Sequence, residues 1–170
     1  MRTSVLRLTI VGLLGLFVWV VAGIVSSPDT ARATPAFQFS SQTLARSLFG
    51  EIDVRTHVDT HKVEIRTKGA SDVYVVSNKV PVGGHSGWHS HPGPSIVSVK
   101  SGTATLYDGD DPNCTPVTYP AGTGFVDKGD GHVHILRNEG TVELETVAFS
   151  IVPAGADRRI DAPDPGYCTF

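Results

Sequence analysis

Two pairs of histidines are the residues of this sequence whose type and spacing suit metal chemistry. His89 and His91 flank a serine, and His132 and His134 flank a valine. Side chains two residues apart on a β-strand point to the same face of the sheet. Imidazole nitrogens that converge from two neighbouring strands are donors that first-row divalent metals prefer. The spacing therefore predicts a metal site within a β-sheet domain.

The residues around the first pair resemble the first motif of the cupin family, G(X)5HXH(X)3E(X)6G. Gly83, His89, His91 and Gly102 match its spacing, and Ser95 stands where the motif has glutamate. Glycine lets the backbone turn into and out of the strands that carry the motif. The serine changes the expected chemistry, because a carboxylate is a good metal ligand and a hydroxyl is a poor one.

The residues around the second pair resemble the second cupin motif, G(X)5PXG(X)2H(X)3N. Gly122, Gly131, His134 and Asn138 follow its order. The stretch departs from the motif twice, because one extra residue follows Gly122 and Gly129 replaces the proline.

The resemblance, which covers residues 83–138, implies a small all-β barrel with a metal in its interior. His89, His91 and His134 would bind one divalent metal ion, and Asn138 would help to order the end of its strand. Imidazole suits iron, zinc, copper and nickel alike, so the identity of the ion stays open among these metals and manganese. The family includes dioxygenases, isomerases, decarboxylases and proteins that only bind ligands, so the fold does not select a reaction.

The missing glutamate leaves three neutral imidazoles and open positions for water or substrate. The charge of the ion would then be uncompensated, which favours strong Lewis acidity and an anionic or enolisable ligand. Asp127 and Asp130, both near the second motif, are alternative oxygen ligands.

The remaining histidines have several interpretations. His132 is a group that supports a ligand, a substitute ligand or an exposed residue near a loop. His85 is expected at the rim of the site, and His57 and His61 on the surface of a strand. Trp88 points away from the face that carries His89 in a regular strand, which makes it a core residue.

Alternation of apolar and polar residues predicts the strands that position these side chains. Val54, Val58, Val63 and Ile65 alternate with polar neighbours, as in half-buried strands. Turns rich in glycine and proline recur at intervals of about eight to twelve residues, as in sandwiches and barrels. We therefore expect an all-β protein, a single cupin-type jelly-roll β-barrel, with one short N-terminal helix over residues 42–49.

The N-terminal residues have the pattern of an export signal. Arg2 and Arg7 precede or border an apolar run over residues 8–25, and Ala31-Arg32-Ala33 offers small residues for cleavage after Ala33. The alternative is an uncleaved helix that anchors the chain in a membrane through residues 8–25. Either interpretation predicts a secreted or cell-envelope protein outside the cytoplasm.

The rest of the chain has the size of one domain. We expect residues 1–33 to be the signal peptide or anchor, residues 34–52 a linker with the short helix, and residues 53–170 the cupin β-barrel domain. The net charge is −3 at pH 7, and without a basic stripe we expect no nucleic-acid partner. The expected partners are a small-molecule ligand or substrate and, through the strands over residues 54–65, a second copy in a homodimer.

Cys114 and Cys168 are the two cysteines of the chain. An even number of cysteines in an exported protein favours a disulfide, which would tie the C-terminal tail to a loop. The alternative, a pair of metal-binding thiols, lacks a CxxC or Cys-His cluster around either residue.

These observations favour a secreted metal-binding cupin-domain protein. If it is catalytic, we expect a metal-dependent oxygenase that acts on a small anionic or enolisable substrate, because three histidines leave adjacent positions for dioxygen and a chelating ligand. The alternative is a non-enzymatic exported module that binds a metal ion or small ligand. A third interpretation is a degenerate barrel that serves only as an interaction protein of the cell envelope.

Overall fold

The computed structural model describes residues 32–170, and every regular element in this range is a β-strand. The signal peptide or anchor predicted over residues 1–33 lies outside the described residues, apart from its last two positions. No helix within the described range has the length and apolar character needed to cross a membrane.

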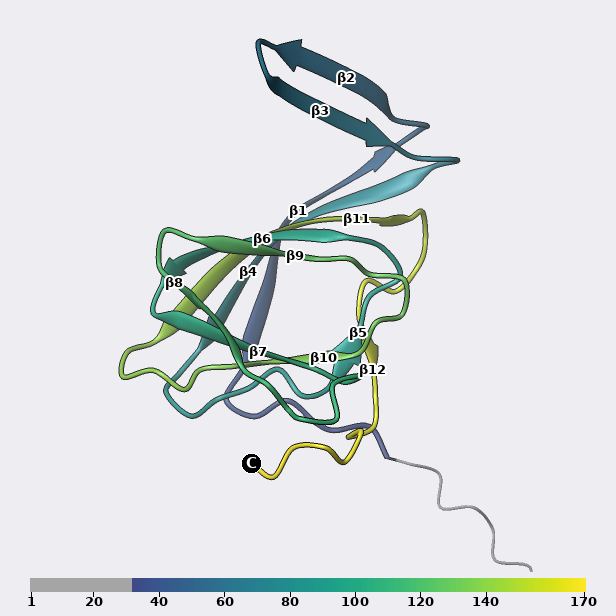
Figure 1. Ribbon diagram of the computed structural model, residues 1–170. Helices are drawn as coiled ribbons and strands as arrows, with labels where there is room; N and C mark the ends of the chain where they lie inside the picture. Colours follow the sequence, from purple (N-terminus) through teal and green to yellow (C-terminus); the bar gives the residue numbers. More distant parts are fainter. Residues whose placement is uncertain (1–31) are drawn as a thin grey trace, which may run out of the picture. The chain divides into compact units, whose positions relative to one another are not determined.

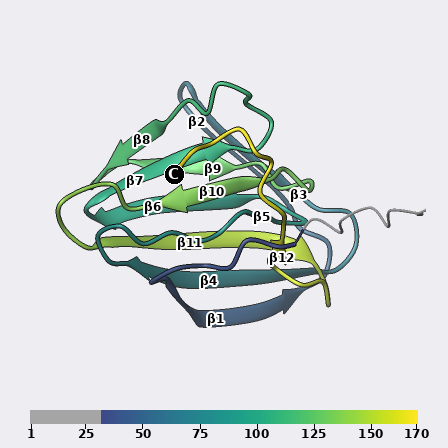
Figure 2. The ribbon, with the colours of Figure 1, turned by 90° about the horizontal axis from the view of Figure 1, so that it is seen from below.

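The strands form two five-stranded antiparallel sheets and a separate hairpin (Figures 1 and 2). One sheet has the order β1-β4-β11-β6-β9, the other has the order β12-β5-β10-β7-β8, and the hairpin is β2-β3. In chain order the strands are β1 (Ser40–Phe49), β2 (Asp53–Val58), β3 (His61–Arg66), β4 (Ser71–Val80), β5 (His89–Ser90), β6 (Ser95–Ser101), β7 (Thr103–Asp108), β8 (Val117–Pro120), β9 (Gly124–Asp127), β10 (His134–Arg137), β11 (Leu144–Pro153) and β12 (Ile160–Asp161).

The core lies between the two five-stranded sheets. In β6, Val97 and Val99 are buried while Ile96 is exposed, so one face of the strand points inward and the other outward. Val99 packs in one cluster with Leu144 of its own sheet and with Leu136 of the opposite sheet. The expected all-β barrel is therefore confirmed, because alternating burial on both sheets lets them enclose a common core.

The predicted short helix over residues 42–49 is wrong. These residues belong to β1, which pairs along its length with β4. Leucine, alanine and arginine favour helices in isolation, but pairing with a long neighbouring strand outweighs a weak local preference. Arg46 also donates a hydrogen bond of 2.7 Å to the buried carboxylate of Asp72. The larger sheet therefore begins before the predicted domain boundary at residue 53.

The hairpin β2-β3 contains the alternating residues that predicted strands. Val54 pairs with Ile65, and Val58 pairs with His61. His57 and His61 are exposed on it, as predicted. The pairing of two copies through these strands stays a prediction.

The predicted disulfide joins Cys114 to Cys168, whose Cα atoms lie 5.3 Å apart. Both cysteines pack against a buried cluster that contains Trp88 and Ile135. Trp88 is thus a core residue, as predicted. The disulfide connects the C-terminal tail to the loop between β7 and β8 and closes a long segment of the barrel.

Removing this disulfide should lower stability. In the double variant C114S/C168S, the free energy of unfolding should fall by about 2–4 kcal/mol, because loss of a crosslink over a loop of this length increases the conformational entropy of the unfolded chain. Urea denaturation followed by circular dichroism measures the change. Dithiothreitol should lower the stability of the wild type by a similar amount and leave the double variant unchanged. Equal stability of the wild type and the double variant would contradict the expectation.

Candidate metal centre

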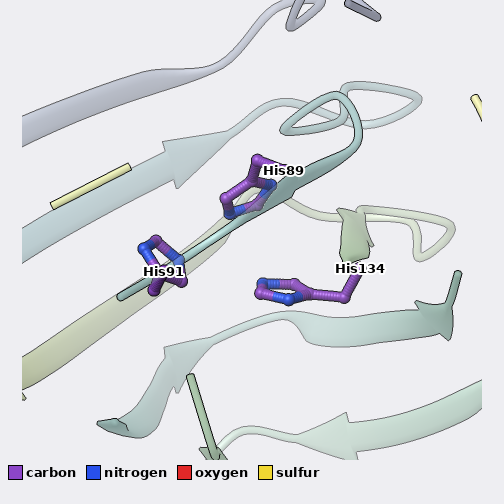
Figure 3. Close-up of side chains that lie close together, drawn as sticks. All are labelled: His89, His91 and His134. Carbon is purple, nitrogen blue, oxygen red and sulfur yellow. The ribbon is translucent and has the colours of Figure 1, made fainter. Parts of the chain in front are cut away.

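Pairing between β5 and β10 brings the three predicted histidines together. His89 of β5 lies directly opposite His134 of β10, and His91 follows two residues after His89. The three side chains turn toward one another (Figure 3), and one nitrogen of each lies within 4.8 Å of the others. The ring centroids of His89 and His134 are 4.4 Å apart. The structure thus assembles the set that the sequence predicted, and this set could hold a metal ion.

Backbone carbonyl groups orient the three rings. Nδ1 of His89 lies 2.9 Å from the carbonyl oxygen of Gly87, and Nδ1 of His91 contacts that of Arg158. Nδ1 of His134 lies 3.3 Å from the carbonyl oxygen of His132. A carbonyl oxygen only accepts hydrogen bonds, so each Nδ1 carries the proton and donates. Each Nε2 is then free to bind a metal, the arrangement that supporting hydrogen bonds commonly give to histidine ligands.

Burial keeps these imidazoles neutral. His89, His91 and His134 are each 6–7% exposed. Burial lowers the pKa of all three, and it is the largest cause for each. For His134 the pKa falls to about 4, with a smaller opposing effect from the nearby Asp127. A neutral ring has a lone pair available for a metal, so the three residues suit metal binding at neutral pH.

Two glycines let the loops that flank the site approach closely. Gly129 has a φ of +69°, and a Cβ at this position would overlap the backbone of Gly93. Gly93 lies just after His91, and Gly129 lies shortly before His134. The replacement of the usual proline by Gly129 therefore fits this close approach, because glycine adopts positive φ without a steric penalty.

Asp127 places a carboxylate beside the histidines. It is the last residue of β9 and lies directly opposite Ser95 of β6. Its Oδ1 accepts a hydrogen bond from the backbone N–H of Gly129, and its Oδ2 lies 3.7 Å from Nε2 of His91. This Oδ2 is buried without a hydrogen-bond partner. A buried carboxylate oxygen without a partner, next to neutral imidazoles, is a donor set that fits a cation.

Asp130, the other predicted oxygen ligand, and Ser95, at the position of the missing glutamate, do not direct a carboxylate at the histidines. Asp130 is exposed and joins none of the metal-binding groups found among residues 32–170. Ser95 is buried, and its hydroxyl forms a hydrogen bond of 2.7 Å with that of Ser150.

The remaining predicted histidines lie around the three central ones. Nε2 of His132 lies 2.8 Å from a carboxylate oxygen of Asp108, and its ring stacks on that of His134. His132 can also form a group with Asp127 and His134, so its role as a substitute ligand stays open. His85 accepts a hydrogen bond from the backbone of Gly87 and does not line the cavity that contains the central three.

The three histidines line a small cavity of about 50 Å³. One water molecule needs roughly 10–15 Å³ on this measure, so the space suits an ion with a few waters or a ligand of a few atoms. Val97, Phe125 and Leu136 supply apolar walls from both sheets. Apolar walls lower the local dielectric constant, so a charge inside the cavity interacts more strongly with its neighbours than it would in bulk water.

Two arginines that the sequence reasoning missed also line this cavity. Arg159 donates hydrogen bonds to the carbonyl oxygen of Ser86 and to the carboxylate of Asp161. Arg158 is partly buried and forms no ion pair with any of the described residues. Burial, followed by the charge of Arg159, lowers the pKa of Arg158 from its ordinary value. The guanidinium remains charged at neutral pH and is available to an anion.

Comparisons with known proteins gave matches among solved structures only. Models of protein families gave no match, and curated proteins gave no significant match. A cupin superfamily protein from Desulfitobacterium hafniense is 12% identical, over 68% of this chain and 78% of its own, with a TM-score of 0.45. A protein with a double-stranded β-helix domain from Klebsiella pneumoniae is 21% identical, over 67% and 80%, with a TM-score of 0.44. A predicted oxalate decarboxylase from Thermotoga maritima is 24% identical, over 50% and 83%, with a TM-score of 0.40.

The placement of the two motif stretches agrees with the resemblance seen in the sequence. The first stretch forms β5 and β6, the second forms β9 and β10, and each strand of one stretch pairs with a strand of the other. The described residues therefore form an all-β barrel in whose interior the two histidine stretches meet, as the resemblance to the cupin motifs predicts.

Proposed function

We propose that this protein binds one divalent metal ion through His89, His91 and His134 and uses the ion to bind a small anionic ligand. The observation that carries the proposal is the clustering of three buried imidazoles, each with Nδ1 beside a backbone carbonyl and one ring nitrogen of each within 4.8 Å of the others. Such a set needs no rearrangement of the backbone to accept an ion. Preorganised donors of this kind are what tight metal sites require.

The cavity favours an anionic ligand with few atoms. Arg158 lines it and forms no ion pair with other described residues, and the volume is about 50 Å³. A positive guanidinium and a metal ion attract the same carboxylate or enolate. Val97 and Phe125 offer apolar surface to the rest of a bound ligand.

The catalytic form of this proposal is an oxygenase. A bound divalent metal supplies Lewis acidity, and a redox-active one also supplies electrons for oxygen chemistry. The three histidines would hold the ion, Arg158 would attract the anionic end of the substrate, and the apolar side chains of the cavity would pack against the rest of it. No proton needs to leave the imidazoles, because each Nδ1 hydrogen is already engaged by a carbonyl oxygen.

The second candidate is a non-enzymatic module that binds a metal or small ligand. One observation favours it: Asp127 is the only carboxylic acid among the described residues that line the cavity, and no lysine or tyrosine lines it. Few groups could therefore transfer a proton to a substrate. Both candidates fit an exported protein, and the disulfide supports this location because such bonds persist in oxidising compartments.

Replacing His91 by alanine should remove the metal and preserve the fold. Loss of one imidazole from the site weakens binding of a divalent ion strongly, so the metal content should fall from about one ion per chain to below about one tenth. Mass spectrometry of metals after dialysis measures the content, and circular dichroism checks the fold. The matched control is H57A, which removes an exposed histidine of the hairpin and should keep the metal. Full metal content in H91A would disprove the assignment.

Loading the metal-free protein with iron(II) or zinc separates the two candidate functions. We expect the iron-loaded protein to consume dissolved oxygen in the presence of small enols, thiols or catechols, measured with an oxygen electrode. The zinc-loaded protein should consume none, because zinc has no accessible redox change. The H91A variant treated with iron is the control for free metal. Absence of oxygen uptake with every compound would favour the binding module.

Replacing Arg158 by glutamine should weaken anion binding without loss of metal. A hydrogen bond to a charged group contributes about 1.5–3 kcal/mol, so the Kd of the zinc-loaded protein for oxalate should rise about 10-fold or more. Isothermal titration calorimetry measures the affinity. The variant R55Q, on the exposed hairpin, is the control for loss of a positive charge. Unchanged oxalate affinity in R158Q would exclude Arg158 as the anion-binding residue.

A further inference from the structure

We infer that Asp127 is a fourth ligand of the metal and replaces, from a neighbouring strand, the glutamate that Ser95 displaces. This inference rests on the proposed metal site, which it completes. It also revises the expectation of a site built from imidazoles alone.

Strand pairing brings the carboxylate to the region where a glutamate would have reached. Ser95 and Asp127 are paired residues of the adjacent strands β6 and β9. Directly opposite residues of an antiparallel pair point to the same face of the sheet, and both side chains are buried and line the cavity. A carboxylate on β9 therefore enters the same part of the interior as one on β6.

The contacts of Asp127 leave one oxygen directed at the histidines. Oδ1 accepts the hydrogen bond from Gly129, which fixes the orientation of the carboxylate. Oδ2 lies 3.7 Å from Nε2 of His91, and Oδ1 lies 4.0 Å from Nδ1 of His134. Two ligands of one ion lie roughly 3–4 Å apart, given metal–ligand distances of about 2.1 Å. The separation of Oδ2 from His91 is in this range.

Without a cation the position of Oδ2 is unfavourable. The side chain of Asp127 is 4% exposed, and its Oδ2 has no hydrogen-bond partner. Among the described residues, no arginine or lysine nitrogen lies within 4.0 Å of its carboxylate, and the histidines within that distance are His91 and His134. A divalent ion bound by these histidines would supply the positive charge that a buried carboxylate requires.

The test compares cobalt(II) binding by the wild type and by D127N. Asparagine keeps the shape of the side chain and can still accept the hydrogen bond from Gly129, but it removes the negative charge. We expect the Kd for cobalt(II) to rise at least about 10-fold and the visible absorption bands of bound cobalt to shift. D130N removes an exposed carboxylate from the same loop and should behave like the wild type.

Two further measurements separate a ligand from a residue that only supports the fold. In the absence of metal, D127N should have a Tm equal to or above that of the wild type, because an unpaired buried charge is removed. A structural role predicts a lower Tm. In the double variant S95E/D127N, a carboxylate returns on β6, and we expect cobalt affinity to recover at least in part. S95A should bind cobalt as the wild type does.

The outcomes distinguish this inference from the proposed function. Wild-type cobalt affinity and an unchanged spectrum in D127N would overturn the role of Asp127 and leave the three-histidine site intact. Absence of cobalt binding by the wild type would overturn both. A lower Tm of metal-free D127N, with no recovery of cobalt affinity in S95E/D127N, would assign Asp127 a structural role instead.

Discussion

The direct pairing of His89 with His134 is the constraint on which the site depends. It joins two stretches that are far apart in the chain and places both imidazoles on the interior face of one sheet. His91 lies just after β5, two residues from His89. The loops that follow His91 and precede His134 approach closely at Gly93 and Gly129. Burial then keeps the rings neutral, and backbone carbonyls fix their direction. Each of these properties would be lost if the two strands paired in another register.

The features that the sequence predicted correctly depend on local geometry. A histidine pair with one residue between its members shares a face on any strand, so the meeting of His89, His91 and His134 followed from spacing and from the cupin motifs. Trp88, next to His89, is in the core for the same reason of alternation. The pairing of Cys114 with Cys168 required only that two cysteines were present. Only the approach of His134 to the other two histidines depends on which strands pair, and the resemblance to the cupin motifs supplied it.

The features that the sequence did not reveal depend on strand order and on distant pairing. Residues 42–49 are helix formers by type, and only the neighbouring β4 makes them a strand. Asp127 was one of two alternative oxygen ligands, and its position opposite Ser95 distinguishes it from the exposed Asp130. Arg158 lies in the segment between β11 and β12, and its approach to the cavity follows from the fold of that segment around His91. Sequence spacing carries no information about such contacts.

The charges around the cavity bear on the ligand that the proposed site would accept. The carboxylate of Asp127 on β9 would offset part of the charge of a divalent ion. Arg158, in the segment between β11 and β12, would add a positive charge at the same cavity. An anion would then meet two positive groups and one negative group, of which the negative one is already engaged with the ion. Because these charges lie within a few ångströms of one another in a partly buried cavity, they interact more strongly than charges in bulk water do. A small anion that contacts both the ion and Arg158 would therefore bind better than a neutral molecule of the same size.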